Sequence, residues 1–397
     1  MDLYTLTDTF LANEPIDDFI SAIWTERYSV RGEVQLKVEA SPEMLTRLTD
    51  GTFLALRGSK EVMQIETQSI ENGLATIAGF SLVNFLDQRM AWFANPSFSS
   101  ENPDKIVDYS YDASPPGKFI ADQVNRLVIN PAPMSGTYAN ANLNWPLEVI
   151  PNLALGAVDL SGTPKRLTLP VGPLYSGLAK IASDEGVGMS MYLESADPVS
   201  GYSLKFTTYS GMDHTQGGNA PLVRLVPELD SINDLKELRS TAFYKNVVYV
   251  YYGGQIYKYW EGMEDSEPEP EGFARRVMVT DAAGSPVGHK ETYSVRNYYT
   301  MDTSTYTRYV VSPAELQAFL DQNARDAMAN NNYIRAIDGE TSPNSDYQYG
   351  IHYGLGDIIE IQGLTGTIAK SRVTEYVRSQ DANGEKQYPT ISVLNKD

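Results

Sequence analysis

The stretch GLGDIIEIQGLTGTIAKSRVTEYVRSQDANGEKQYPTISV, residues 354–393, decides the fold because strand-forming runs alternate in it with turn-forming residues. The runs are Ile358–Ile361, Ile368–Val377 and Tyr388–Val393, and the turns are Gly363–Gly366 and the polar loop Ser379–Glu385. β-Branched runs between Gly and Asn-Gly pairs are typical of antiparallel strands joined by hairpins. The chain is therefore expected to end in an antiparallel sheet.

A weaker copy of this stretch lies near the N-terminus, in the order turn, run, turn, run, Asn-Gly, run, between Asp50 and Ile77. Upstream of each copy stands a helix-start signal, Ser41-Pro42 and Ser312-Pro313, with Ser as N-cap and Pro at the first helical position. The repeat predicts two modules with equivalent turns, and chance is the alternative because Gly and Asn-Gly punctuate any β protein. The structural turn residues of the predicted modules are Gly51, Asn72, Gly73, Gly356, Asp357, Asn383 and Gly384.

The segment Gly32–Glu39 has the clearest strand pattern. Val34, Leu36 and Val38 alternate with charged or polar residues, so one face of the strand is expected to be buried and the other to be exposed.

Composition excludes several classes of protein. The 397 residues include 31 basic and 51 acidic residues, and the formal charge of −20 argues against direct binding to nucleic acid or to anionic membranes. The chain has no cysteine, so a disulfide framework and a thiolate metal site are excluded. The N-terminus lacks the pattern of a signal peptide, and no apolar run reaches the roughly 20 residues of a membrane helix.

The expected fold is mainly β with α+β insertions. Residues 1–100 are expected to form the first module, 101–200 a small α+β middle domain, and 201–397 the second module. A Pro-, Ser- and Asn-rich segment, Asn95–Gly136, marks the first boundary. The second module is expected to contain a helix near 313–331 and an acidic loop at 261–272 that extends a hairpin into solvent, with a calcium or partner site there as the minority alternative.

No catalytic, cofactor-binding or metal-binding residues are expected. A nucleophile elbow and the common zinc and phosphate-binding motifs are absent from the sequence. The three histidines are expected to lie at the surface or in turns, and the most suggestive local cluster is Gly211–Thr215, where Asp213 and His214 could pair. The aromatic cluster Tyr249–Tyr259 fits a sugar platform or, more commonly, a core or an interface.

Three parts of the sequence resemble the Gp37-like tail proteins of siphoviruses, a branch of the phage tail hub (tail-associated or baseplate hub) proteins. They are Asp50–Ile70, Leu204–Phe206 with Tyr209–Thr215, and Gly354–Asp357 with Arg372–Glu375. The resemblance implies two tail-tube-like β-barrel modules plus accessory domains, and a homotrimer whose six modules form a ring of pseudo-sixfold symmetry.

The function implied by this resemblance is that of a virion structural protein rather than an enzyme. It would be made in the host cytoplasm and would sit at the distal end of the tail, where the ring continues or closes the tail tube and links it to host-attachment components. The implied partners are a distal tail protein, a tape measure protein and tail fibre or receptor-binding proteins. The alternative is a carbohydrate-binding adhesin or a glycan-cleaving tail enzyme.

Overall fold

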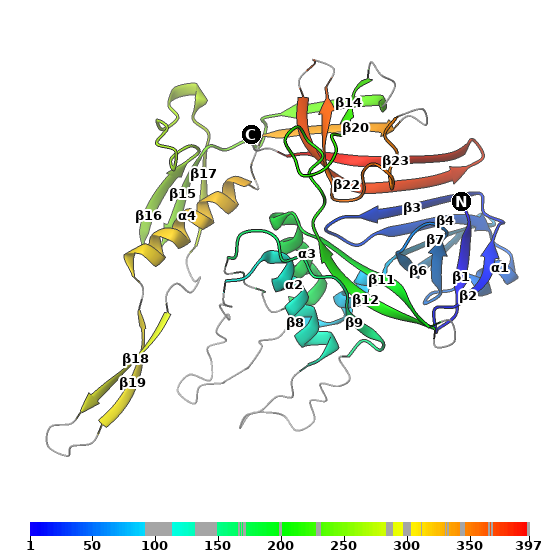
Figure 1. Cartoon of the computed structure of the whole chain (residues 1–397), viewed down its shortest axis with the longest axis horizontal. Coiled ribbons are helices and arrows are strands. Elements are labelled where there is room, and N and C mark those ends of the chain that lie inside the picture. Colours follow the sequence, from blue (N-terminus) through cyan, green and yellow to red (C-terminus); the bar gives the residue numbers. More distant parts are fainter. Residues whose placement is uncertain are drawn as a thin grey trace. The chain divides into compact units, whose positions relative to one another are not determined.

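Two compact units make up the chain in the computed structural model (Figure 1). The first contains Met1–Glu237 and Ile337–Leu394, and the second contains Leu238–Ala336. Most of the expected boundary segment Asn95–Gly136 lies outside the described residues, and the expected division at residues 100 and 200 stays a prediction. The structure describes residues 1–91, 113–131, 149–165, 167, 169, 172–197, 201–227, 232–282, 289–296, 303–310, 312–329, 331, 333–341, 346–363, 366 and 368–394.

A large, mostly antiparallel sheet dominates the first unit. Its N-terminal half consists of β1 (Leu3–Leu6), β2 (Ala12–Ile16), β3 (Ser21–Arg27), β4 (Glu33–Glu39), β5 (Phe53–Leu56), β6 (Val62–Glu71) and β7 (Leu74–Ser81), with the short helix α1 (Pro42–Arg47) after β4. Its C-terminal half consists of β13 (Arg224–Leu225), β14 (Ile232–Ser240), β20 (Ile334–Thr341), β21 (Ile358–Gln362), β22 (Ile368–Asp381) and β23 (Gly384–Val393).

Alternating burial in β4 confirms the strand pattern found in the sequence. Val34, Leu36 and Val38 are buried, and they pack in a core that includes the fully buried Trp24 of β3. Apolar burial of this kind contributes about 25 cal/mol per Å², so this inner face stabilises the N-terminal half of the sheet. The Ser41 side chain caps α1 by accepting a hydrogen bond from the Met44 amide, as the Ser-Pro signal predicts.

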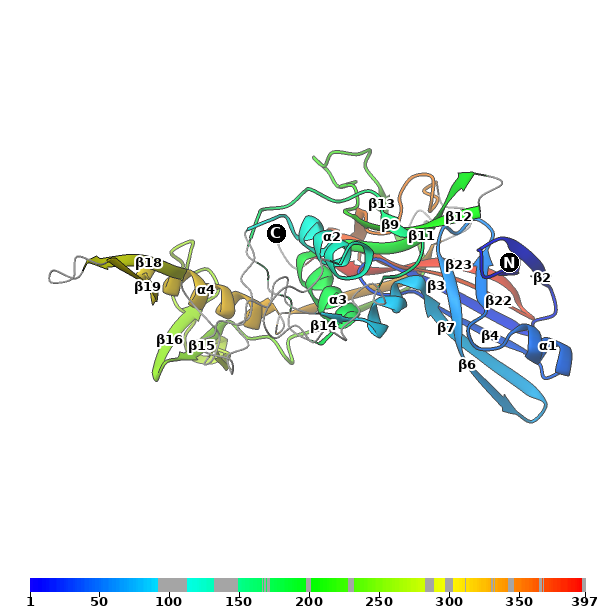
Figure 2. The ribbon, with the colours of Figure 1, turned by 90° about the horizontal axis from the view of Figure 1, so that it is seen from below.

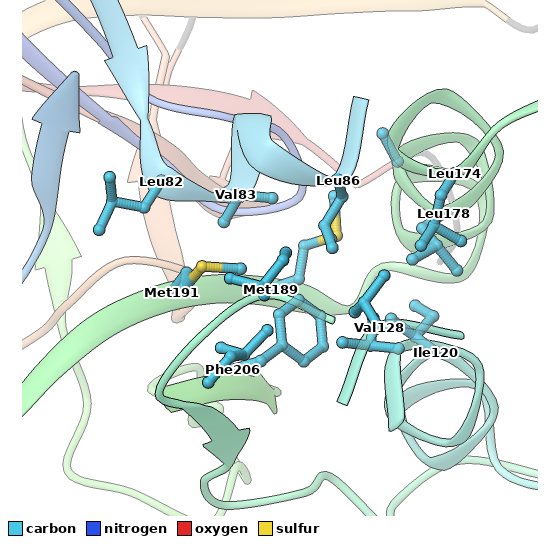
Figure 3. Close-up of a cluster of buried hydrophobic side chains, with 14 of the residues drawn as sticks. Leu82, Val83, Leu86, Ile120, Val128, Leu174, Leu178, Met189, Met191 and Phe206 are labelled. Carbon is cyan, nitrogen blue, oxygen red and sulfur yellow. The ribbon is translucent and has the colours of Figure 1, made fainter. Parts of the chain in front are cut away.

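A layer of short helices and a β-hairpin packs beside this sheet around its own core (Figure 3). In the close-up, Leu82, Val83 and Leu86 lie above Met189, Met191 and Phe206, and Leu174 and Leu178 lie beside Leu86. The layer consists of η1 (Leu82–Gln88), β8 (Met90–Ala91), α2 (Pro116–Val124), η2 (Asn125–Ile129), β9 (Leu153–Leu155), β10 (Gly172–Pro173), α3 (Leu174–Glu185), β11 (Gly188–Asp197) and β12 (Gly201–Tyr209).

The second unit contains a three-stranded sheet in the order β16-β15-β17 with one helix, α4, packed on it. Val248 and Val250 of β15 contact Leu320 and Ala324 of α4 in one buried cluster. The elements are β15 (Val247–Tyr252), β16 (Gln255–Trp260), η5 (Gly272–Ala274), β17 (Val277–Asp281), the hairpin β18 (His289–Arg296) and β19 (Thr303–Val310), and α4 (Pro313–Ala329).

Two expectations from the sequence need correction. The described strands of the large sheet form a path that ends at β14 and β2, so they do not close into a barrel within one chain. The acidic residues 261–272 do not extend a hairpin, because β17 runs parallel to β15 and the acidic segment is the crossover from β16 to β17. Its exposed carboxylates include Glu264, which pairs with Arg325, and the segment also holds Glu269, which pairs with Lys258 and Arg275.

Candidate assembly interface

Strand order is the same in the two halves of the large sheet. The N-terminal half runs β3-β4-β7-β6-β5, and the C-terminal half runs β14-β20-β23-β22-β21. In each half the last three strands in the sequence form an antiparallel meander, β5-β6-β7 and β21-β22-β23. Corresponding strands therefore follow one another in the same order along the chain and across the sheet.

Gly51 and Gly356 each stand two residues before the first strand of a meander. Their φ angles are +85° and +91°, a region that favours glycine. The Gly51 amide donates to the Ile65 carbonyl at 2.8 Å, and the Gly356 amide donates to the Val373 carbonyl at 2.8 Å. The surroundings differ, because a Cβ on Gly51 would meet open space whereas one on Gly356 would lie 2.2 Å from the Tyr28 ring.

A β-bulge follows at the same place in each meander. The Ile65 amide donates to the Thr52 carbonyl and the Val373 amide donates to the Asp357 carbonyl, both at 2.9 Å. The register then shifts immediately after Ile65 in β6 and immediately after Val373 in β22. Bulges bend a strand and redirect its next part, so both long strands leave their first neighbour at the same point.

The two Asn-Gly pairs are placed less alike. Asn72 and Gly73 form the loop between β6 and β7, with φ angles of +51° and +79°. In the second hairpin Gly384 pairs with Asp381, so Asn383 lies in the loop while Gly384 already belongs to β23. The Asn383 amide donates to the Asp381 carboxylate at 2.7 Å, which stabilises a different turn.

Hydrogen bonds to Asp357 hold the loop that begins at Gly211 against the start of β21. Asp357 is 6% exposed, and its carboxylate accepts hydrogen bonds from the backbone amides of Met212, at 2.7 Å, and Gly354, at 2.6 Å. His214 is only 3% exposed, so the expected surface or turn histidine is in fact buried. Its Nε2 lies 3.3 Å from Asp357 Oδ2, and its Nδ1 lies 2.7 Å from the Pro221 carbonyl oxygen.

Glu360 makes a second attachment of the same loop. Its buried carboxylate accepts from the Gln216 amide at 2.8 Å and from Arg224 Nε at 2.6 Å. The expected partner of His214, Asp213, instead accepts from the Thr215 amide at 3.0 Å. The only signal for Glu360 in the sequence is an acidic residue inside an apolar run.

The two halves of the sheet join where β22 pairs with β3, side by side in both views (Figure 1 and Figure 2). Arg27 of β3 donates to Glu375 of β22 and to Glu33 of β4, both at 2.6 Å. Arg378 of β22 pairs with Glu26 of β3 at 3.2 Å, with both side chains little exposed. Backbone pairing and two ion pairs therefore hold this junction together.

Tyr28 anchors the junction to the helical layer. Its amide donates to the Thr374 carbonyl at 2.9 Å, and its hydroxyl lies 3.0 Å from the Gly186 carbonyl oxygen. The Arg372 guanidinium lies over the ring, 5.1 Å from its centroid. Burial raises the pKa of Tyr28, which keeps the hydroxyl protonated and able to donate.

Glu61 carries a buried carboxyl group near the junction. It is 7% exposed, its Oε1 accepts from Ser190 Oγ at 3.3 Å, and its Oε2 has no hydrogen-bond partner among the described residues. Burial, together with the nearby Glu26 carboxylate, raises the pKa of Glu61 from 4.5 to about 8. Glu61 also forms a backbone β-bridge to Tyr192 of β11, so both its backbone and, through Ser190, its carboxyl group contact that hairpin.

The described residues do not form a metal centre of the usual kind. They contain no group of three or more His, Asp or Glu side chains placed to hold a metal ion. Over the same ranges, no helix has the length and apolar character needed to cross a membrane.

Comparison with known proteins identifies a family and a fold. The sequence model for the family described as Siphovirus ReqiPepy6 Gp37-like protein matches residues 3–391. A search of curated proteins gives no match.

Two solved structures superpose on nearly the whole chain. A tail protein from Neisseria meningitidis is 11% identical with a TM-score of 0.55, and the alignment covers 99% of this chain and 96% of that one. A 43 kDa tail protein of prophage MuSo2 from Shewanella oneidensis is 11% identical with a TM-score of 0.52, covering 99% of this chain and 98% of that one. At this identity the likeness concerns the fold.

Proposed function

The chain belongs to the siphovirus ReqiPepy6 Gp37-like family, and on that premise we propose that it is a structural protein of a phage tail, without enzymatic activity. Three copies would form a ring at the distal end of the tail that continues or closes the tail tube and links it to host-attachment components. The fold likeness to two tail proteins supports this assignment.

The observation that carries the proposal is the duplicated strand order, β3-β4-β7-β6-β5 and β14-β20-β23-β22-β21. Two similar modules in one chain allow three chains to offer six similar surfaces to a sixfold partner, which a single module in three copies cannot do. In this reading Gly51 and Gly356 are equivalent turns of the two modules, and so, approximately, are Asn72-Gly73 and Asn383-Gly384.

The proposed partners follow from this position. They are a distal tail protein above the ring, a tape measure protein within the tube, and tail fibre or receptor-binding proteins at the periphery. The formal charge of −20 suits a passage for DNA, because like charge lets the polyanion move without adhering.

A carbohydrate-binding role is the second candidate, and one face of the β16-β15-β17 sheet favours it. Opposite α4, strand register places Tyr249, Tyr251 and Trp260 on the same face as Ile256 and Val279. Ile256 and Val279 are each 69% exposed, and Tyr251 is 42% exposed. An exposed aromatic surface of this kind can stack against sugar rings.

Light scattering and negative-stain imaging of the purified chain distinguish the two functions. The structural function predicts a threefold ring with three times the mass of one chain, 44.0 kDa. A persistent monomer that binds or cleaves glycans would contradict it and support the adhesin or enzyme.

A further inference from the structure

We propose that the exposed part of β6, Thr67–Glu71, pairs edge to edge and antiparallel with β14 of a second copy of this chain. The pairing would repeat, between chains, the junction that β22 and β3 form within one chain. This inference rests on the proposed ring and specifies the contact that closes it.

The starting point is that β22 has a partner that β6 lacks. The first part of β22 pairs with β21, and after the bulge Glu375–Gln380 pairs with β3. The first part of β6 pairs with β5, and after its bulge the strand pairs with β7 on one side only, among the described strands. The matching bulges place Thr67–Glu71 of β6 where β22 carries its junction segment.

The junction segment of β22 is more buried than Thr67–Glu71 of β6, as expected if β6 lacks a neighbouring strand that β22 has. In β22, Tyr376 and Val377 are buried and the rest of the junction segment is only partly exposed. In β6, only Gln68 of Thr67–Glu71 is partly covered, and Ile70 is 54% exposed. A strand edge with unpaired backbone groups and an exposed isoleucine is a template for another strand.

The complementary edge is β14. By strand order β14 corresponds to β3, the strand that receives β22. β14 is the terminal strand of the sheet path, so one of its edges has no partner among the described strands. Each chain therefore offers two different free edges, one on β6, which corresponds to β22, and one on β14, which corresponds to β3.

This arrangement favours a ring over a two-chain complex. The two edges differ, so the contact is head to tail and generates a closed ring or an open filament. Pairing of β6 with β6 of a second copy would instead give a symmetric dimer with β14 unused. The internal β22–β3 junction also joins two different edges, which favours β14 of a second copy as the partner strand of β6.

The absence of cysteine from the chain permits a clean cross-linking test. One cysteine replaces Ser69 in the full-length protein, and a second replaces one position of β14 at a time. The second positions are Asn233, Asp234, Leu235, Lys236, Glu237, Leu238 and Arg239. Mild oxidation is followed by non-reducing electrophoresis and mass spectrometry. Neighbouring side chains of a strand point to opposite faces, so disulfides are expected at alternate β14 positions only.

The expected result is a ladder of disulfide-linked chains that ends at a covalent trimer. The S379C/I23C variant is the matched control, because these positions face each other at the internal junction and should cross-link within one chain. Cross-linked dimers from S69C alone, without a β14 cysteine, would show β6–β6 pairing and overturn the proposal.

The mass of the uncross-linked wild-type protein separates failure of this inference from failure of the proposed function. A wild-type trimer that forms no β6–β14 disulfide, while the control cross-links, refutes the strand pairing and leaves the ring intact. A wild-type monomer at every concentration refutes both.

Discussion

Raising the pH should lower the free energy of unfolding because Glu61 is buried, and replacing Glu61 with Gln should remove that pH dependence. In the folded state burial and the Glu26 carboxylate hold the pKa of Glu61 at about 8, whereas 4.5 is its ordinary value in the unfolded chain. Below pH 4.5 Glu61 is protonated in both the folded and the unfolded chain, so its burial lowers stability by no pH-dependent amount. Between pH 4.5 and about 8 only the unfolded state loses its proton, so stability falls as pH rises.

The size of the effect follows from that interval. One pKa unit corresponds to about 1.4 kcal/mol, so the loss across the window is at most roughly 5 kcal/mol. A small domain has a net stability of about 5–15 kcal/mol, so a loss of even half that size is measurable.

The assay is urea unfolding monitored by circular dichroism at several pH values between 4.5 and 9. The E61Q variant keeps the shape of the side chain but cannot ionise, so its free energy of unfolding should lack the decline attributed to Glu61. An unpaired N–H of the new amide would lower stability by an amount that does not depend on pH, so the slope is unaffected.

The matched control is E71Q, which removes an exposed glutamate from the same strand, β6. It should keep the wild-type slope. If E61Q and wild type lose stability in parallel between pH 4.5 and 8, then Glu61 is already ionised in the folded protein and the reasoning is wrong.

Two further substitutions test the turn and the junction. G356A should lower the free energy of unfolding by about 3 kcal/mol or more, because the new Cβ would clash with the Tyr28 ring and the residue would have to adopt a left-handed backbone conformation. G51A should lower it by only about 1 kcal/mol, because the backbone conformation is its one cost. Equal losses for the two variants in urea unfolding would contradict this. R378M should cost about 3 kcal/mol because it leaves the little-exposed Glu26 carboxylate without its partner, and a combined R378M/E26Q variant should recover much of the loss in a thermal melt.

The sequence predicted local features better than closure of the sheet. The alternation around Leu36 and the Ser41 cap depend on near neighbours, and both are confirmed. Barrel closure depends on which distant strands meet, and the pairing of β22 with β3 joins residues about 350 positions apart with no local signal. For that reason the sequence offered no means of predicting that the described strands form an open path and no closed barrel within one chain.

The candidate interface was only partly visible in the sequence. Gly51 and Gly356 were found because a left-handed turn demands a particular residue. The buried roles of His214 and Glu61 were not, because a titratable residue carries no mark of burial in its own neighbours. The difference between the two Asn-Gly turns was missed because the pair alone does not fix the register: both residues of the first pair lie in the loop, whereas Gly384 already pairs with Asp381.

The chain leaves the large sheet after β14 and returns at β20, and most of the second compact unit lies in the sequence between these neighbouring strands. For the sheet, residues 241–333 are thus equivalent to a long loop between adjacent strands. Insertions at such places are tolerated because few core contacts depend on them. The strand order can therefore be inherited unchanged while this unit is lengthened, exchanged or redesigned, which makes it the natural place to graft a new binding specificity.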